Sequence, residues 1–240
     1  MRKVIAAALV VAAFALPACD FINIDTIHGN GNLTTETRNV SSASDIESHG
    51  FFDVEIVHGS SPSVKIEADE NLIPYILTEN EDGKLVIHTK DHVGLSSNNK
   101  IKVYVTTDRV DGIALSGSGN VTSDAKLDGS NHLRLSISGS GDMTLDINTP
   151  YVESSISGSG NINLSGETKD SKITITGNGD YKASDLQAEN AEVHITGSGS
   201  VNVATSVKLT VRITGSGDVY YKGSPAIEQH ITGSGTIKQM

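Results

Sequence analysis

The chain has 240 residues, no tryptophan, 4% aromatic residues and a formal net charge of −11. This charge argues against nucleic acid as a partner, because binding to a phosphate backbone depends on clustered lysine and arginine. Electrostatic attraction to anionic lipid is disfavoured for the same reason. With so few aromatic rings, a large core must consist of aliphatic side chains.

Residues 1–18 have the features of a secretory signal peptide of the lipoprotein type. Arg2 and Lys3 form a basic start, and an apolar run follows over residues 4–16. This run is too short for a typical membrane-spanning helix with the usual flanks. The leader therefore predicts export from the cytoplasm.

The only cysteine, Cys19, directly follows Leu16-Pro17-Ala18, a sequence similar to the bacterial lipobox, in which the cysteine is lipidated and becomes the first mature residue. Leu16 suits a lipoprotein signal and is a poor residue for ordinary signal peptidase, whereas Pro17 departs from the usual small residue. We predict lipidation at Cys19, which would link the chain to a membrane. The alternative is conventional cleavage after residues 13–15, with Cys19 left as a free thiol.

The segment after the cysteine is expected to be a tether over residues 19–40, because it is rich in Asn, Thr and Gly. Asp20 resembles the signal that retains some enteric lipoproteins on the periplasmic face of the inner membrane. Without Arg2 and Lys3, 16 basic residues stand against 29 acidic ones, a net charge of −13. The expected location is the cell envelope, facing the periplasm or the cell surface, and the choice of membrane stays open.

Residues 41–240 are predicted to form one β-solenoid domain, with irregular N-terminal rungs and a cap over residues 41–112. Repeat arrays need atypical ends, because an open last rung offers unpaired backbone groups to other chains. The strand candidates in this part are irregularly spaced and separated by polar inserts; they cover residues 52–57, 64–67, 84–88 and 100–105, and the inserts cover residues 79–83 and 94–99.

Residues 113–240 contain a motif that recurs seven times: an aliphatic residue, Ser or Thr, and a Gly-x-Gly unit that is mostly Gly-Ser-Gly. Successive motifs begin 22, 19, 19, 20, 18 and 18 residues apart, a period typical of a solenoid. The glycines are predicted to turn the corners, since glycine accepts positive φ at no steric cost. These corner glycines are Gly117, Gly119, Gly139, Gly141, Gly158, Gly160, Gly177, Gly179, Gly197, Gly199, Gly215, Gly217, Gly233 and Gly235.

The flanking residues form columns of like side chains. Apolar and polar residues alternate within each repeat, as in half-buried strands, and no stretch here reads as a helix. We predict an all-β fold, a single-chain parallel β-helix with rungs of about 18–22 residues stacked ~4.8 Å apart. One interior column precedes the corners and another follows them: Leu115, Ile137, Ile156, Ile175, Ile195, Ile213 and Ile231, then Val121, Met143, Ile162, Tyr181, Val201, Val219 and Ile237.

The residues directly after the corners alternate between aspartate and neutral polar residues. This places successive carboxylates nearly ~10 Å apart and favours a structural ladder, in which Asn161 donates its amide to a neighbouring aspartate. Weak cation binding by Asp142, Asp180 and Asp218 is the alternative. The motif differs from the calcium-binding repeat-in-toxin sequence, which places its aspartate two residues past the glycine. No cofactor is predicted.

Among the eight histidines, His88 and His92 have the closest spacing to a metal-binding pair. On a strand they would lie ~13 Å apart, too far for one ion. A turn at Asp91 could bring them together, but a solvated pair is the favoured interpretation.

Residues 45–237 resemble the head GIN domain family of auto-transporter adhesins. The resemblance rests on the iterated Ile-Thr/Ser-Gly-Ser-Gly motif, on the lipoprotein-like leader, and on the Phe-Asp-Val-Glu-Ile and Val-Lys-Ile-Glu stretches that begin at Phe52 and Val64. It implies a single-chain parallel β-helix at the cell envelope, and it supplies no catalytic residues.

Two functional classes remain open. The first is a non-enzymatic cell-envelope lipoprotein, an adhesin-like binding or scaffold module whose solenoid surface meets an envelope glycan or another protein. The second is a carbohydrate-active enzyme, a polysaccharide lyase or hydrolase on the same scaffold. An enzyme needs acid and base groups that converge on one face, and the predicted register disperses them. Neither the ligand nor the oligomeric state follows from the sequence.

Overall fold

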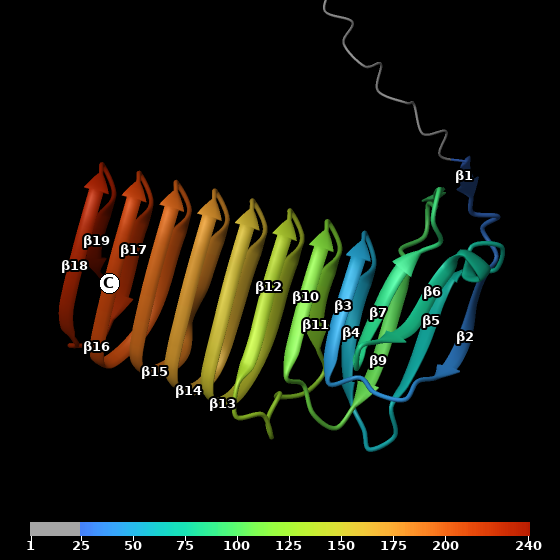
Figure 1. Cartoon of the computed structure of the whole chain (residues 1–240), viewed down its shortest axis with the longest axis horizontal. Helices are drawn as coiled ribbons and strands as arrows, with labels where there is room; N and C mark the ends of the chain where they lie inside the picture. Colours follow the sequence, from blue (N-terminus) through green and yellow to red (C-terminus); the bar gives the residue numbers. More distant parts are fainter. Residues whose placement is uncertain (1–24) are drawn as a thin grey trace, which may run out of the picture.

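The computed structural model describes residues 25–240, which form an elongated parallel β-solenoid with a cap at its N-terminal end (Figure 1). The predicted fold class is confirmed. The leader, Cys19 and Asp20 lie outside the described residues. Within residues 25–240, no helix combines the length and apolar character that crossing a membrane requires.

The elements of the described residues are nineteen strands and one short 3-10 helix, in this order: β1 Asp25–His28, β2 Leu33–Asn39, β3 Asp45–Gly50, β4 Asp53–His58, β5 Ser63–Asp69, η1 Ile73–Tyr75, β6 Ile76–Glu81, β7 Lys84–Thr89, β8 Val93–Ser96, β9 Lys102–Thr107, β10 Gly112–Gly117, β11 Asn120–Ser123, β12 Leu133–Gly139, β13 Asp142–Gly158, β14 Asn161–Gly177, β15 Asp180–Gly197, β16 Ser200–Gly215, β17 Asp218–Lys222, β18 Ala226–Gly233 and β19 Thr236–Gln239.

The regular rungs pair in parallel with their corners aligned. Both predicted interior columns are confirmed, because each member pairs with the next along the array. The side chains of Ile156, Ile175 and Ile195 are at most 2% exposed. Tyr181 fills its place in the second column with its hydroxyl 3.4 Å from Ser171 Oγ, as a buried tyrosine requires.

The two glycines of each corner serve different purposes. The first has φ between 124° and 135° in all seven corners, a conformation that L side chains rarely adopt. The second is needed for space: a Cβ on Gly179 would lie 2.3 Å from the carbonyl oxygen of Gly160 in the preceding rung. Positive φ, the reason predicted for both glycines, therefore applies to the first only.

One further rung, β3 and β4, has the same geometry. Its corner is Gly50, with φ 122°, which pairs with Gly117 although 67 residues separate them. The chain leaves this rung, builds β5 to β9, and returns to lay β10 on the other side of β3. Figure 1 shows β3 between β10 and β7.

The cap is partly antiparallel. β5 pairs antiparallel with β2 and β9, and β6 forms an antiparallel hairpin with β7. The tether predicted for residues 19–40 is therefore wrong for residues 25–28 and 33–39, which are strands β1 and β2. The polar composition of β2 suits an exposed edge strand, since backbone pairing with β5 supplies the contacts that its side chains do not.

Candidate functional site

The corner residues form the expected ladder of hydrogen bonds from rung to rung. Asp142 Oδ1 accepts from the backbone N–H and the side-chain Nδ2 of Asn161, at 3.0 and 2.7 Å. Asn161 Oδ1 accepts in turn from the backbone N–H of Asp180 at 3.3 Å. Each side-chain oxygen thus satisfies an N–H of the following rung, which aligns the stack.

The remaining aspartates act in the same way. Asp180 Oδ1 accepts from the backbone N–H of Ser200 at 3.1 Å, and Asp218 Oδ1 accepts from the backbone N–H and hydroxyl of Thr236 at 2.9 and 2.6 Å. The hydroxyl bond from Thr236 lowers the pKa of Asp218. Because neutral residues stand between them, the structure does not bring Asp142, Asp180 and Asp218 together.

An open polar groove of ≈390 Å³ lies where the N-terminal rung meets the regular array. Side chains from β4, β9, β11, β13 and β14 line it, together with Lys100 just before β9. The lining residues are Asp53, Val54, Glu55, Lys100, Lys102, Asn120, Val121, Thr122, Asp142, Thr144 and Asn163. Sequence reasoning named Asp142 as a candidate ligand and Val121 as an interior residue. The residues from β4 and β9 join them through pairing across distant segments, which the repeat does not predict.

The groove is lined by hydrogen-bond donors and by hydrogen-bond acceptors. Asp53 accepts from Lys100 Nζ at 3.0 Å and from Asn120 Nδ2 at 2.8 Å, and Asn163 Nδ2 donates to Thr144 Oγ1 at 3.2 Å. Two lysines, three carboxylates, two amides and two hydroxyls therefore face the same space. Such a surface can bond to a ligand rich in hydroxyl groups.

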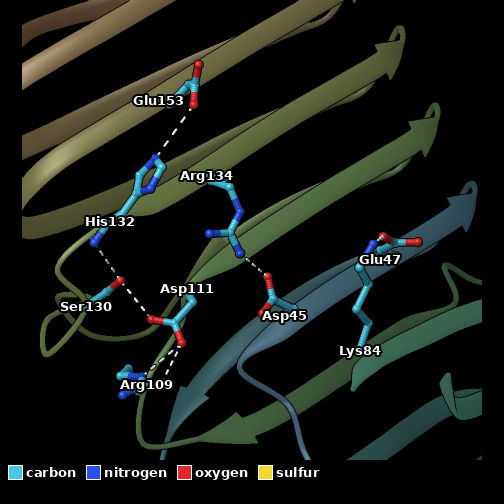
Figure 2. A network of polar contacts seen from close by, with 9 residues as sticks. All are labelled: Asp45, Glu47, Lys84, Arg109, Asp111, Ser130, His132, Arg134 and Glu153. Atoms are coloured by element: carbon cyan, nitrogen blue, oxygen red, sulfur yellow. Dashed lines mark hydrogen bonds and ion pairs between the residues drawn. The ribbon is translucent and has the colours of Figure 1, made fainter. Parts of the chain in front are cut away.

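Charged side chains on β3, β7 and β12 join the N-terminal rung to the array (Figure 2). Arg134 Nη2 of β12 lies 2.7 Å from Asp45 Oδ1 of β3, across 89 residues of chain. Lys84 of β7 bonds to Glu47 of β3, and this bond raises the pKa of Lys84. These contacts link β12 and β7 to β3, with β10 lying between β3 and β12. Exposed ion pairs of this kind add little to stability.

A second group of contacts runs from the loop before β10 to the loop before β12 and on to β13. Asp111 accepts from Arg109 Nη2 at 2.7 Å and from Ser130 Oγ at 2.8 Å, and Ser130 Oγ accepts the backbone N–H of His132 at 3.3 Å. His132 Nε2 lies 3.6 Å from Glu153 Oε2. Figure 2 shows these residues in sequence from Arg109 to Glu153. Arg109 is paired with Asp111, and Glu153 is paired with Lys172 Nζ at 2.7 Å, so we assign these contacts to the fold.

A row of hydroxyl side chains lies on the regular rungs, each directly before the first glycine of a corner. All seven members are exposed, and the parallel register places them on successive rungs ~4.8 Å apart. This hydroxyl row consists of Ser116, Ser138, Ser157, Thr176, Thr196, Thr214 and Thr232.

Aligned Gly-x-Gly corners, aliphatic interior columns and polar outer faces define a β-solenoid protein with a surface suited to binding. The chain belongs to the family described as "Putative auto-transporter adhesin, head GIN domain", whose model matches residues 44–225. The resemblance seen in the sequence is confirmed, and the family agrees with an envelope or cell-surface location. A comparison with the curated proteins gives no match.

Solved structures support the same assignment. A "putative lipid binding protein" from Parabacteroides distasonis is 28% identical, with a TM-score of 0.77 over 90% of this chain and 100% of that one. A "putative adhesin" from Parabacteroides merdae is 27% identical, with a TM-score of 0.74 over 90% and 99%. A "putative adhesin" from Bacteroides fragilis, 22% identical with a TM-score of 0.80 over 89% and 100%, supports the fold alone.

Proposed function

We propose that the protein is a non-enzymatic, adhesin-like binding module of the cell envelope, and that its polar groove binds an envelope glycan. The observation that carries this proposal is the groove itself, in which amides, hydroxyls and charged groups from five strands face one open space. A glycan presents hydroxyl groups that both donate and accept, so it matches this mixed lining better than an apolar ligand does.

The arrangement of the groove carboxylates favours binding over catalysis. Asp53 and Asp142 stand two rungs apart, nearly ~10 Å along the stack, with Asn120 between them. Each already accepts a hydrogen bond from an asparagine amide. Glu55 stands two residues from Asp53 on the same strand face, about 7 Å away, which is within the separation of glycosidase carboxylate pairs. Both oxygens of Asp53 are engaged, however, Oδ1 by Asn120 and Oδ2 by Lys100, whereas a catalytic carboxylate needs an oxygen free for proton transfer or attack. This is why we prefer a binding module to a polysaccharide lyase or hydrolase.

Removing the polar groups on the groove floor is expected to weaken glycan binding. In the triple variant Thr122→Ala, Thr144→Ala and Asn163→Ala, the loss of three hydrogen-bonding groups, at about 0.5–1.5 kcal/mol each, predicts at least about tenfold weaker binding. The measurement is co-sedimentation of the full chain with purified peptidoglycan sacculi. None of these side chains is in the corner ladder, so the fold should be retained.

The matched control removes an equal number of hydrogen-bonding side chains, three hydroxyls of the hydroxyl row, as Ser116→Ala, Ser138→Ala and Ser157→Ala. This control is expected to bind like the parent. If the control loses binding and the groove variant keeps it, the groove is not the binding site. If the parent releases reducing sugar from the sacculi, the protein is an enzyme and the proposal is wrong.

We also propose that a lipid on Cys19 anchors the module to a membrane, which the lipobox-like sequence supports. Replacing Cys19 with serine is expected to abolish incorporation of labelled palmitate and to release the protein from washed membranes, because no other cysteine can take its place. A Cys19→Ser variant that stays membrane-bound in the parent amount would show that the lipobox interpretation is mistaken.

A further inference from the structure

The hairpin of β6 and β7 gathers two carboxylates and an imidazole on the surface of the cap. One ligand atom from each of Glu79, Glu81 and His88 lies within 4.8 Å of the others. In the antiparallel register, Glu79 pairs with Val86 and Leu77 pairs with His88, so the three side chains stand on one face of the hairpin. Carboxylate oxygens and an imidazole nitrogen are metal-ligand groups.

The backbone holds one nitrogen of the His88 ring. His88 Nδ1 lies 3.1 Å from the carbonyl oxygen of Thr89, which can only accept, so Nδ1 carries a proton and donates this bond. The other ring nitrogen, Nε2, lies 3.4 Å from Glu79 Oε2. In metal-binding histidines, one ring nitrogen commonly donates to a carbonyl oxygen and the other binds the ion. Here Nδ1 donates to Thr89, and Nε2 is the nitrogen that faces the cluster.

The two carboxylates lack a cationic partner apart from this histidine. No lysine or arginine among residues 25–240 forms an ion pair with Glu79 or Glu81. Lys84 pairs with Glu81 in the strand register, yet its ammonium bonds to Glu47, as Figure 2 shows for Lys84 and Glu47.

The backbone beneath the cluster is held in place. Asp82 and Gly83, with φ of 48° and 84°, form the two-residue turn that joins β6 to β7 directly. Between the two glutamates, Asn80 accepts the backbone N–H of Ser41 at 2.8 Å and donates to the carbonyl oxygen of Ser42 at 2.8 Å. The carboxylates are therefore carried by a fixed strand, and only their side chains need to move.

We propose that Glu79, Glu81 and His88 bind one divalent transition-metal ion, and that zinc is the best match. Zinc takes imidazole and carboxylate ligands at about 2.0–2.2 Å, so small side-chain rotations close the existing separation, and water completes the coordination. Imidazole disfavours calcium and magnesium, which prefer oxygen ligands alone. The bound ion would join the two strands of the hairpin.

The test is calorimetric titration of zinc chloride into the full chain carrying Cys19→Ser, which removes the only thiol. We expect one ion per chain. In this background, Glu81→Gln and His88→Gln should each weaken binding at least about tenfold, since each removes a ligand. Calcium chloride should give no comparable heat.

The matched control is the double variant Glu192→Gln and His194→Gln. This pair lies on the regular array with His194 Nε2 2.8 Å from Glu192 Oε1 and is not part of a three-ligand cluster. Zinc affinity should stay within about twofold of the parent value. Absence of zinc binding in the parent, or unchanged affinity in a folded His88→Gln variant, would overturn the proposal.

Discussion

Replacing Ile175 with aspartate is expected to destabilise the protein by more than about 4 kcal/mol, a large share of the stability of a typical domain. Ile175 is 0% exposed and pairs with Ile156 and Ile195 in the adjoining rungs. A carboxylate there would lose its water without gaining a partner. Because each rung depends on its neighbours, the defect should spread through the array. Urea denaturation followed by circular dichroism measures the effect.

The control for this variant is Thr174→Asp, which adds the same charge to the outer face of the same strand. Thr174 is exposed, so the carboxylate stays hydrated and the expected loss is below about 1 kcal/mol. Equal denaturation midpoints for the two variants would contradict the assignment of Ile175 to the interior column.

Replacing Gly177 with alanine is expected to cost about 3–5 kcal/mol, because two penalties act together. The residue has φ 124°, and a Cβ there would lie 2.4 Å from the carbonyl oxygen of Gly158 in the preceding rung. The neighbouring atom is backbone, so it cannot rotate away as a side chain would. Thermal unfolding should show a correspondingly large drop in Tm.

Two further alanine variants separate these penalties. Gly129 has φ 78° and its nearest contact would be 3.8 Å away, so Gly129→Ala measures the backbone conformation alone, at about 1–2 kcal/mol. At Gly179 a positive φ is not involved, but a Cβ would lie 2.3 Å from the Gly160 oxygen, so Gly179→Ala measures the contact. If Gly177→Ala costs no more than Gly129→Ala, close packing of the corners does not limit the sequence.

The regular rungs were predictable because the repeat places equivalent residues in register. Once one isoleucine column is recognised, parallel stacking fixes the neighbours of the residues near the corners. Farther from the corners the register shifts, between Asn163 and Ser165 and between Ala183 and Gln187, because the repeats differ in length. The bond that Asn161 donates to Asp142 followed from the same register, and the structure adds the bond that Asn161 accepts from the backbone N–H of Asp180. The periodicity of the sequence therefore predicts the parallel rungs of the C-terminal half.

The N-terminal rung was not predictable in the same way. At its corner, Gly50 is followed by Phe51 and Phe52, so the Gly-x-Gly signature is missing. Its pairing with Gly117 also spans 67 residues, which no local pattern encodes. The polar groove depends on this pairing, because Asp53 and Glu55 reach it only when β4 lies beside β11.

The hairpin cluster could have been found from sequence. Asp82-Gly83 between alternating residues is a strong signal for a two-residue hairpin turn. That turn pairs Glu81 with Lys84, and counting back places Glu79 diagonally beside His88. When residues 79–83 are interpreted as a polar insert, their pairing with residues 84–88 is missed. His92 is then the candidate metal-binding partner of His88. The partners that the structure gives His88 are Glu79 and Glu81.

The position of β3 between β7 and β10 has a consequence for the order of folding. Pairing Gly158 with Gly177 closes a separation of 19 residues, whereas pairing Gly50 with Gly117 closes 67. Closing the longer loop costs about 1 kcal/mol more in chain entropy than closing the shorter one, and this cost precedes the favourable contacts. We therefore expect the regular rungs to assemble first and to serve as the template on which β3 and β4 dock. A rung that is synthesised before the regular array would then reach its native place after it.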